Sequence, residues 1–590
     1  MVRNSVINNE IEQASNPTNN RRESIKLINS SLLNWTIGLY SGHGKYLTAE
    51  NFGYKLNVTG IVLKKKQYWT LIPELIEDTF SKILVNNVDA PIVYLKSMMD
   101  RYLTIDRFGN VSCEADTADE EQRFALVFYL DSHKDDSWKA DRWGPYLLLN
   151  VKHNYYLSAN AKNNTLKGLN KPVDPSEYWS LHLQVHPPYI NLKHIHRQKY
   201  AKTFCPESVC LSDVIPWGLE SLFTLERVSQ DRCDSNIING SDKVDNIFNP
   251  TMYTIKTFNG NYLTSNGKSI PADIKKIQSQ ALFFLIYVQG YLAFRDKDGK
   301  YLTAIGNEGA IKCKKSILSK EELWTVTGSS PQINFKGSND KFVSAQRSID
   351  IVVNQDEMSE LETFQLENDS TGKFWRFKTV SDKYWSVGDN ACVKCVDDNT
   401  SLTSKIKSMF MDDKNSDKDK FDITWLPNKQ LGIKSISNNK YLTLKINKQL
   451  FATANDIGER EKFKLYLVNR PFLVLQGTEG YVGEGKAIEG HLDTTKILYE
   501  ETFIEQLTHE SYHFKTKNGL YWTLQDESQQ IMALPKSKIK DGRPHTFFII
   551  FKESSKIIIM AQNNNFIKIG AGKKLEATEQ NQQNASIWNI

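Results

Sequence analysis

Three short constellations in this 590-residue chain contain residue types that can bind phosphate or metal. Residues Gly480–Lys486 have the spacing G-x-x-x-x-G-K, which in a phosphate-binding loop continues with Ser or Thr and leads into a helix. Here Ala487 follows the lysine, so the hydroxyl that would bind Mg²⁺ is missing, and the segment falls between predicted strands. We therefore interpret this match as a chance occurrence in a β-turn.

The other two constellations are pairs of potential metal ligands. His194 and His196 are two positions apart, a spacing that places both imidazoles on one face of a strand, where they could bind Zn²⁺. No third ligand is near them in the sequence, so we interpret them as a surface pair. Cys392 and Cys395 form C-V-K-C, but the second cysteine pair of a zinc site is missing. The 7 cysteines are scattered and odd in number, which favours reduced thiols, and we expect neither a metal nor a cofactor.

Signatures of catalysis are missing from the sequence. It contains neither a G-x-S-x-G nucleophile elbow nor an H-E-x-x-H zinc element. Acidic residues are abundant, but no pattern pairs two of them for general acid–base chemistry. We therefore expect a binding or structural protein and not an enzyme.

The composition is that of a globular protein with a modest positive charge. Hydrophobic residues make up 40% and charged residues 24%, and the net charge is only +5, so any basic site must be a local cluster. This balance argues against a dedicated nucleic-acid binder. No run of 18 apolar residues and no signal-peptide pattern occurs, which predicts a cytoplasmic protein without membrane insertion. Residues 1–33 are rich in Asn, Ser and charge, and we expect a disordered extension there.

An internal repeat indicates which elements would position a binding site. A turn residue, often a basic residue, an aromatic residue, an apolar residue and usually Thr or Ser recur twelve times. The copies are Gly44–Thr48, Asp100–Thr104, Asn154–Ser158, Gln198–Lys202, Gly260–Thr264, Gly299–Thr303, Asp340–Ser344, Asp382–Ser386, Asn439–Thr443, Glu479–Gly483, Gly519–Thr523 and Asn564–Lys568. An acidic or polar turn and an aromatic strand follow each copy, as in Lys65–Leu71 and Glu321–Val326.

The repeat predicts β-hairpins that must assemble. Asn259-Gly260, Asp298-Gly299 and Asn518-Gly519 are tight-turn dipeptides, and one hairpin cannot bury its apolar face alone. A propeller blade has a similar length, but its G-H…W-D signature does not occur. Proline-containing segments before residues 189, 332 and 472 instead divide the twelve units into groups of three. Three hairpin units per domain is the arrangement of the β-trefoil, a six-stranded barrel capped by hairpins.

We therefore predict an all-β chain of four tandem β-trefoil domains. Their expected limits are residues 34–186, 187–329, 330–469 and 470–590. Long helical periodicity is missing, and only Glu74–Val85 is predicted to form a surface helix, as an insertion in the first domain.

Longer strings in the chain resemble the fascin family. Gly44–Val58 reads G-K-Y-L-T-A-E-N-F-G-Y-K-L-N-V, and Leu63–Leu71 reads L-K-K-K-Q-Y-W-T-L. Further matches are Ile215–Gly218, Ala293–Asp296, Asn354–Glu357, Glu362–Glu367 and Asn469–Pro471. These strings are collinear and spread over essentially the whole chain after the extension. The resemblance implies the four-trefoil fold and a monomer that bundles F-actin in the actin cytoskeleton, in filopodia, microvilli or similar cell projections.

A monomer that bundles filaments needs at least two basic faces, because filament surfaces are acidic and a single face would only decorate a filament. Lys64, Lys65 and Lys66 follow an exposed-looking turn, and a solvated charge run is the plain alternative. The resemblance implies an actin site at this run, with Lys45 close to it in the folded domain. It also implies actin contacts for Lys445, Lys486 and Lys568. Arg197 and Lys199 add a basic pair at alternate positions of one predicted strand.

Two positions depart from the family pattern. Fascins commonly carry a phosphorylatable Ser directly before L-K-K-K, where this chain has Ile61-Val62, so Thr59 is the nearest hydroxyl. A phosphate there would neutralise the lysines and repel an acidic filament. A basic residue that the family uses in its second domain is replaced by Tyr291.

The alternative function on the same fold is multivalent, lectin-like carbohydrate binding. Trefoil lectins usually repeat Q-x-W in each unit, and this chain shows no such series.

Overall fold

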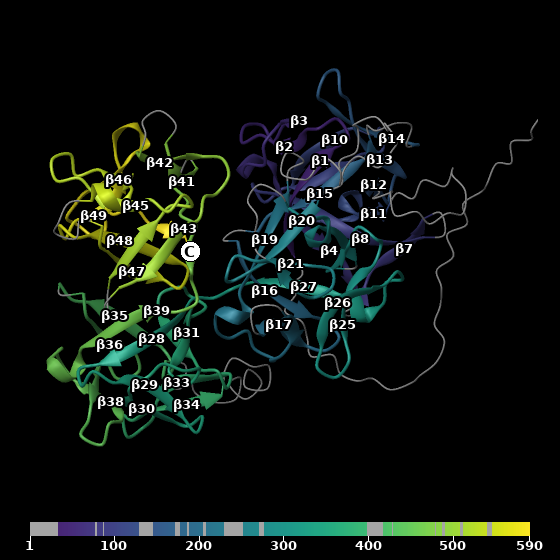
Figure 1. Cartoon of the computed structure of the whole chain (residues 1–590). Helices are drawn as coiled ribbons and strands as arrows, with labels where there is room; N and C mark the ends of the chain where they lie inside the picture. Colours follow the sequence, from purple (N-terminus) through teal and green to yellow (C-terminus); the bar gives the residue numbers. More distant parts are fainter. Residues whose placement is uncertain are drawn as a thin grey trace, which may run out of the picture.

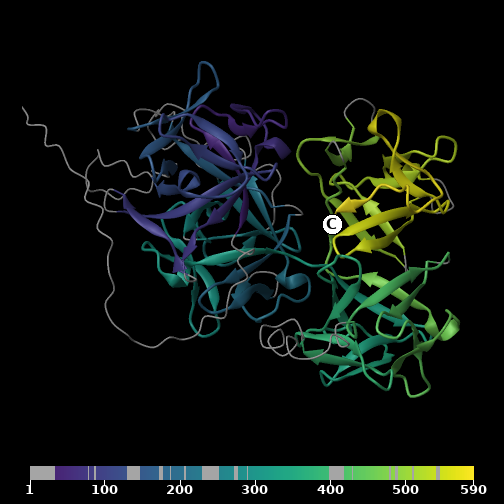
Figure 2. The ribbon, with the colours of Figure 1, turned by 180° about the vertical axis from the view of Figure 1, so that it is seen from behind.

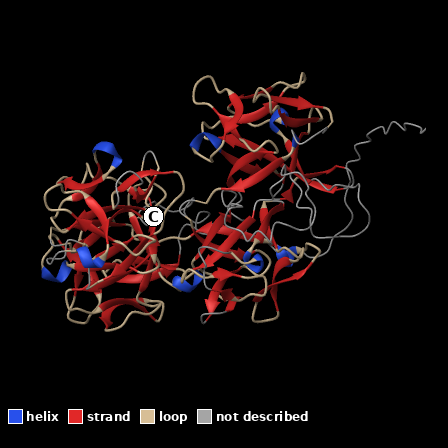
Figure 3. Ribbon diagram, turned by 45° about the horizontal axis from the view of Figure 1, so that its top comes forward, coloured by secondary structure: helices blue, strands red, loops and turns tan. Residues whose placement is uncertain are grey.

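The computed structural model describes residues 34–76, 79–85, 88–128, 146–171, 177–185, 188–204, 208–228, 252–270, 277–288, 290–397, 417–427, 429–477, 480–485, 490–507, 511–539 and 545–589. The N-terminal extension expected at residues 1–33 lies outside these ranges. Strands dominate the described residues, and the helices among them are short 3-10 turns (Figure 3). These turns are η2 (Lys65–Gln67), η3 (Glu120–Gln122), η5 (Leu219–Ser221), η7 (Ser279–Ala281), η8 (Lys320–Glu322), η10 (Glu459–Glu461), η11 (Lys536–Lys538) and η12 (Ala571–Lys573). Within the described ranges, no helix has the length and apolarity to cross a membrane.

The third repeat group shows the architecture most regularly. Its strands are β28 (Gln332–Gly337), β29 (Phe342–Gln346), β30 (Asp350–Gln355), β31 (Thr363–Asn368), β32 (Trp375–Lys378), β33 (Lys383–Val387), β34 (Val393–Asp397), β35 (Phe421–Trp425), β36 (Leu431–Ser435), β37 (Tyr441–Leu444), β38 (Leu450–Ala454) and β39 (Phe463–Leu467). Six strands close a barrel, because each of β28, β31, β32, β35, β36 and β39 pairs with the next and β39 pairs again with β28. The other six form three hairpins, which backbone hydrogen bonds link to one another. A six-stranded barrel with three associated hairpins is a β-trefoil.

The first and second groups repeat this closed topology. The first contains β1 (Trp35–Ser41), β2 (Tyr46–Ala49), β3 (Leu56–Gly60), β4 (Tyr68–Pro73), β5 (Leu75–Ile76), β6 (Thr79–Phe80), β7 (Lys82–Val85), β8 (Val88–Ser97), β9 (Tyr102–Ile105), β10 (Val111–Ala115), β11 (Phe124–Phe128), β12 (Tyr146–Asn150), β13 (Tyr155–Ala159), β14 (Leu166–Leu169) and β15 (Trp179–Leu183). The second contains β16 (Tyr189–His194), β17 (Lys199–Phe204), β18 (Ser208–Leu211), β19 (Phe223–Val228), β20 (Met252–Thr257), β21 (Tyr262–Leu263), β22 (Ser269–Ile270), β23 (Phe283–Val288), β24 (Tyr291–Arg295), β25 (Tyr301–Ile305), β26 (Ala310–Lys315) and β27 (Trp324–Gly328). In the first, β1, β4, β8, β11, β12 and β15 close the barrel. In the second, β16, β19, β20, β23, β24 and β27 do so.

The fourth group has the same order of strands in a more open form. Its strands are β40 (Phe472–Leu473), β41 (Tyr481–Glu484), β42 (Leu492–Lys496), β43 (Thr502–Gln506), β44 (Tyr512–Lys515), β45 (Tyr521–Leu524), β46 (Ile531–Leu534), β47 (Phe547–Glu553), β48 (Lys556–Ala561), β49 (Phe566–Ile569), β50 (Leu575–Glu579) and β51 (Trp588–Asn589). Pairing runs from β40 through β43, β44, β47 and β48 to β51. The predicted fold of four tandem β-trefoils is therefore confirmed, and the four are called trefoils 1 to 4.

A recurring hydrogen bond explains why a tryptophan follows some of the repeats. The indole N–H of Trp69 donates to the carbonyl of Leu47 at 3.2 Å, within the first Y-L-T unit. Trp324 makes the same bond to Leu302 at 2.9 Å, and Trp179 makes it to Leu157 at 3.0 Å. A buried indole N–H usually finds an acceptor, and in these units that bond joins the hairpin to the following barrel strand.

A second recurring contact involves the aromatic residue of the repeat. In eight of the twelve units, a basic side chain on the adjacent barrel strand lies over its ring, at 4.7 to 5.8 Å from the centroid. The pairs are Lys96–Tyr102, Lys193–Tyr200, Lys256–Tyr262, Arg295–Tyr301, Lys336–Phe342, Lys378–Tyr384, Lys434–Tyr441 and Lys515–Tyr521. Such cation–π contacts stabilise by about 0.5–2 kcal/mol each. Part of the chain's positive charge therefore belongs to the scaffold.

The helix predicted at Glu74–Val85 is wrong, because this insertion is made of strands. β5 and β6 form a small hairpin, and β7 pairs along the first half of the long strand β8. Its apolar residues follow the two-residue period of a sheet, since Ile83 and Val85 are half-buried whereas Lys82 and Leu84 are exposed. Pairing with an available strand edge decided the conformation, and that edge is not visible in the local sequence.

The trefoils associate in pairs to form two lobes (Figure 1). The buried residues of trefoils 1 and 2 form one continuous cluster, and those of trefoils 3 and 4 form another. Both pairs use the same junction. The backbone N–H of Leu183 donates to the hydroxyl of Tyr253 at 2.8 Å, and that of Leu467 donates to the hydroxyl of Tyr512 at 3.1 Å.

A smaller interface joins the lobes through trefoils 2 and 4. Tyr189, Phe472 and Val474 belong to one buried cluster there, and the Arg470 guanidinium lies over the Tyr189 ring at 4.6 Å. In Figures 1 and 2 the lobes lie side by side, with trefoil 4 (yellow) level with trefoil 1 (purple). The four trefoils thus form one body in which surfaces on different trefoils have fixed relative positions.

Candidate functional site

The three lysines at Lys64–Lys66 are exposed because the residue after them is anchored. The side chain of Gln67 accepts a 3.0 Å hydrogen bond from the backbone N–H of Lys64 and donates one of 3.0 Å to the hydroxyl of Thr48. Gln67 is buried, and η2 places the lysines before it in solvent. The hairpin β2–β3 and the start of β4 therefore hold this basic segment on the surface of trefoil 1.

Among the described residues, one of the three ammonium groups makes an ion pair. The Nζ atom of Lys66 lies 2.6 Å from Oε2 of Glu50, and this contact lowers the pKa of the Glu50 carboxyl. Lys64 and Lys65 make no ion pair with any residue in the described ranges. An exposed pair contributes only about 0–1 kcal/mol, so Lys66 can exchange Glu50 for another carboxylate at small cost.

Lys45 and Thr59 lie on the same hairpin as this lysine segment. Lys45 precedes β2, whose far end carries Glu50, and its Nζ atom donates to the side-chain oxygen of Asn164 at 2.8 Å. Thr59 is exposed on β3, and its hydroxyl donates to the side chain of Asn57 at 2.5 Å. The structure therefore brings Lys45, Thr59 and Lys64–Lys66 together on one unit of trefoil 1.

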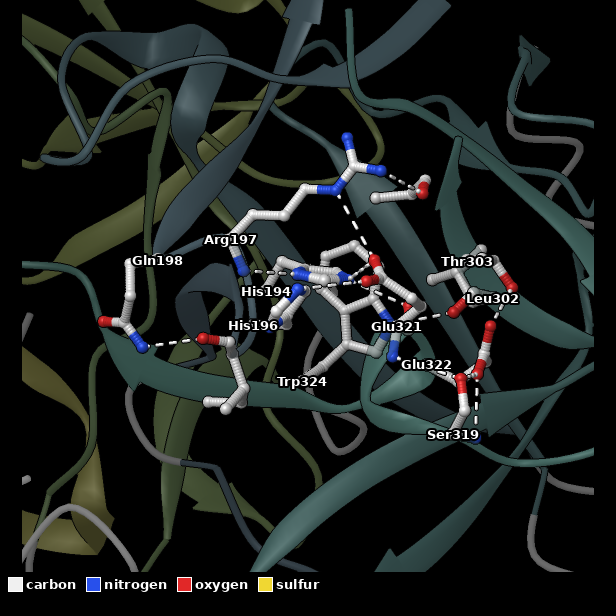
Figure 4. A network of polar contacts seen from close by, with 12 residues as sticks. His194, His196, Arg197, Gln198, Leu302, Thr303, Ser319, Glu321, Glu322 and Trp324 are labelled. Atoms are coloured by element: carbon white, nitrogen blue, oxygen red, sulfur yellow. Dashed lines mark hydrogen bonds and ion pairs between the residues drawn. The ribbon is translucent and has the colours of Figure 1, made fainter. Parts of the chain in front are cut away.

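The expectation that Arg197 and Lys199 share one strand face is wrong. Arg197 lies in the turn between β16 and β17, whereas Lys199 is the first residue of β17. The Arg197 guanidinium donates to the carbonyls of Gly306 at 2.6 Å and Ala304 at 2.9 Å and lies 3.5 Å from Glu321 (Figure 4). Its charge holds two loops of trefoil 2 together, while Lys199 is exposed.

The two histidines beside Arg197 are not a surface pair. His194 is fully buried, its Nε2 lies 2.8 Å from the carbonyl of Glu321, and its Nδ1 accepts from the backbone N–H of Arg197 at 3.1 Å (Figure 4). Burial lowers the pKa of His194. His196 is exposed and lies 3.2 Å from Glu321. Both ring nitrogens of His194 are thus occupied by the fold, and no group of three potential ligands occurs in the part of the chain that the structure describes.

The remaining predicted cations are spread over trefoils 3 and 4. Lys445 follows β37 and Lys568 lies in β49, and both are half-exposed. Lys486 lies outside the described residues. In trefoil 4, burial raises the pKa of Tyr481 to about 12, with a smaller contribution from Tyr68, which follows η2 in trefoil 1.

Cys392 and Cys395 are both buried in trefoil 3. Burial raises the pKa of the Cys395 thiol to about 12, which leaves it protonated and unreactive at neutral pH. Both thiols are free in the structure.

A second basic cluster, which the sequence analysis missed, lies in the third unit of trefoil 2, on and after the hairpin β25–β26. The units correspond strand for strand, because Leu47 is paired with Val58 in one and Leu302 with Cys313 in the other, after a bulge at the same place. The cluster consists of the exposed lysines Lys312, Lys314, Lys315 and Lys320. Cys313 interrupts Lys312, Lys314 and Lys315, and Lys320 lies on the following 3-10 turn, so the cluster does not form an uninterrupted run of lysines. Alignment of Trp69 with Trp324 reveals them.

The two units differ in their most informative detail. Lys65 of trefoil 1 corresponds to Lys320 of trefoil 2, but Lys66 corresponds to Glu321, the residue that contacts Arg197. The second unit therefore places Lys312, Lys314 and Lys315 on the strand β26 and Lys320 on η8, while Glu321 belongs to a local network. The result is two basic surfaces on two different trefoils, built on the same hairpin and 3-10 turn.

Comparison with known proteins places the chain in a family. A family model described as the fascin domain matches residues 43–181, 246–326 and 338–465, which is more than half of the chain. The chain belongs to the fascin family. Its matched segments lie in trefoils 1 to 3.

Similarity to individual relatives extends over nearly the full length. The chain is 27% identical over 580 residues to Fascin-2 of Bos taurus, covering 97% of this chain and 99% of the relative. It is 26% identical over 552 residues to Fascin of Strongylocentrotus purpuratus, covering 91% and 94%. Among solved structures, a designed 3-fold symmetric protein, ThreeFoil, shares 15% identity and covers 25% of this chain and 97% of its own, with a TM-score of 0.19.

The structure also explains one departure from the family pattern. Tyr291, where the family resemblance leads us to expect a basic residue, makes an edge-to-face contact with Phe80 of the trefoil 1 insertion at 5.3 Å between ring centroids. Burial raises the pKa of its hydroxyl. This position therefore serves the contact between trefoils 1 and 2.

Proposed function

We propose that this protein cross-links actin filaments into tight parallel bundles through basic surfaces on different trefoils. The fascins are structural actin-bundling proteins, and that general activity comes with membership of the family. The observation that supports the proposal most directly is a pair of basic units on different trefoils, each built on a hairpin and a 3-10 turn, one around Lys64–Lys66 in trefoil 1 and one around Lys312–Lys320 in trefoil 2.

Each basic surface would attract an acidic filament and dock on it. Exposed lysines contribute through long-range attraction, which speeds the encounter and weakens as salt screens the charges. Lys64 and Lys65 are unpaired among the described residues, so their charges are available to a filament. Lys45, Lys199, Lys445, Lys486 and Lys568 would extend the contacts to other parts of the surface.

A monomer can hold two filaments at a defined spacing and angle only if its binding faces do not move independently. Trefoils 1 and 2 share one core, and the lobes are joined at the interface between trefoils 2 and 4. A filament held by one face would therefore present the other face at a fixed angle to a second filament. We place the protein in the cytoplasmic actin cytoskeleton, in filopodia, microvilli or similar projections.

Phosphorylation of Thr59 is the proposed regulatory step at the first surface. The hydroxyl is exposed, and the lysine segment begins five residues after it. A phosphate carries about −1.5 to −2 charges, which would offset most of the charge of three lysines and repel an acidic filament. A Thr59→Glu variant should bundle less than a Thr59→Ala variant in the same assay.

Sedimentation with purified actin filaments tests the proposed function. The wild-type protein should pellet filaments as bundles at low speed, while a Lys64→Ala/Lys65→Ala/Lys66→Ala variant should fold normally and bundle poorly. Binding to a glycan array without any binding to filaments would overturn the proposal in favour of the carbohydrate-binding alternative. Unchanged bundling by the triple variant would remove this surface from the site.

A further inference from the structure

The tip of the β2–β3 hairpin presents an unusually exposed aromatic side chain. Phe52 is 90% exposed. The backbone on either side of the tip is closed by a 2.9 Å hydrogen bond from the N–H of Glu50 to the carbonyl of Lys55. Gly53 and Tyr54 have positive φ values of 66° and 48°, so the chain reverses tightly directly after the phenyl group.

This conformation is held in place from outside the hairpin. A positive φ is uncommon for a tyrosine, and Tyr54 keeps it while its ring stacks against the Arg101 guanidinium at 5.2 Å. The guanidinium comes from the neighbouring repeat, and it fixes the tip. Phe52 thus projects into solvent from a turn whose backbone conformation is held in place.

Single exposed apolar residues are common on protein surfaces, so the functional significance of Phe52 depends on the residues around it. A second large apolar residue, Ile61, is 77% exposed at the opposite end of β3. The segment that starts at Ile61 continues through the three lysines and returns to the tip, where the Lys66 ammonium contacts Glu50 at 2.6 Å. Lys55 adds another exposed charge beside the tip.

We propose that Phe52, assisted by Ile61, is an apolar anchor of the first filament-binding surface. This inference rests on the proposed function and assigns to that surface a contact other than charge. The surrounding lysines attract an acidic partner, and that partner is the actin filament. Burial of the phenyl group in an apolar recess of the filament then slows dissociation, since aromatic side chains at the centre of a contact dominate its stability.

The two contributions respond differently to salt, which allows them to be separated. Charge attraction weakens with ionic strength, whereas apolar burial does not. Loss of the phenyl group should therefore shift filament affinity by the same factor at every salt concentration. Loss of a lysine should change the steepness of the salt dependence.

The test compares Phe52→Ser with Phe108→Ser in quantitative co-sedimentation with actin filaments over a series of KCl concentrations. Phe108 is a matched control, since it is 66% exposed at the tip of the β9–β10 hairpin of the same trefoil, outside the lysine segment. We expect Phe52→Ser to weaken filament binding about tenfold at each concentration, with an unchanged melting temperature. Phe108→Ser should bind like the wild type.

Wild-type affinity in Phe52→Ser, or an equal loss in both variants, would overturn the anchor. So would a Phe52→Ser variant that loses binding only to phosphatidylserine vesicles, because the tip would then serve a membrane surface. Failure of the wild-type protein to bind filaments would instead overturn the proposed function, so the two outcomes can be told apart.

Discussion

Lys256 of trefoil 2 and Glu501 of trefoil 4 lie 3.3 Å apart in the interface between the two lobes, and both side chains are largely buried. Lys256 also contacts Glu226 at 2.9 Å, and Glu226 in turn accepts a 2.7 Å hydrogen bond from the hydroxyl of Tyr499. Burial lowers the pKa of Lys256, but the two carboxylates raise it by more, so the ammonium stays charged. One lysine therefore neutralises acidic residues from both lobes.

Removal of this lysine should loosen the contact between the lobes. In Lys256→Met the carboxylates of Glu226 and Glu501 face each other without a cation, which costs about 3–5 kcal/mol for a buried pair. We expect a lower melting temperature and a larger radius of gyration by small-angle X-ray scattering. The exposed Lys373→Met serves as a control, and identical scattering from both variants would show that the pair does not join the lobes.

The junction between trefoils 1 and 2 should weaken in acid. Burial, reinforced by the Arg227 guanidinium 2.8 Å away, lowers the pKa of His182 well below its usual value. A lowered folded-state pKa means that the contribution to stability is present above about pH 6.5 and is lost as the pH falls through the folded-state pKa. The free energy of unfolding, measured with urea at several pH values, should fall more steeply in this range for the wild type than for His182→Gln. Equal slopes would contradict this assignment.

Arg197 and Lys199 should behave as different kinds of residue. Arg197→Ala removes two hydrogen bonds to backbone carbonyls and should lower the free energy of unfolding by about 1–3 kcal/mol. Lys199→Ala removes an exposed charge and should leave stability within about 0.5 kcal/mol of the wild type while weakening filament binding a few-fold. Thermal unfolding and co-sedimentation of both variants separate these effects. If the Arg197→Ala protein were stable but bound filaments poorly, Arg197 would have to be assigned to the filament-binding surface.

The salt concentration that abolishes bundling should be lower than the concentration at which the protein unfolds. The lysine surfaces are exposed and therefore screened within a Debye length of about 8 Å at physiological ionic strength, whereas the cores of both lobes are apolar. Light scattering by filament bundles should decline with added KCl while circular dichroism of the protein alone stays constant. Bundles that persist until the protein unfolds would argue against charge as the source of attraction.

The fold was largely predictable because each hairpin unit repeats its own chemistry. Turn glycines, the aromatic residue and the following tryptophan or phenylalanine recur in order, and hydrogen bonds such as Trp69 to Leu47 join them locally. The strands of the Glu74–Val85 insertion were not predictable, since they depend on the distant edge of β8. The limits expected for the four domains remain predictions.

The candidate site was only partly visible in the sequence. Lys64–Lys66 form a run, so they stand out. Lys312 and Lys314 alternate along a strand, and only the structural register with the first unit reveals them. The hydrogen bonds from Arg197 to the carbonyls of Gly306 and Ala304 link residues more than a hundred positions apart. No local pattern could have shown that this guanidinium is used within the fold.

The most direct test of the account uses two variants, each lacking one basic surface. Lys64→Ala/Lys65→Ala/Lys66→Ala removes the surface on trefoil 1, and Lys312→Ala/Lys314→Ala/Lys315→Ala/Lys320→Ala removes the one on trefoil 2. Each variant is assayed with actin filaments at high speed for binding and at low speed for bundling. We predict that each still binds filaments through its remaining surface but neither forms bundles. Bundling at the wild-type level by both variants would contradict the claim that two separate basic surfaces hold two filaments.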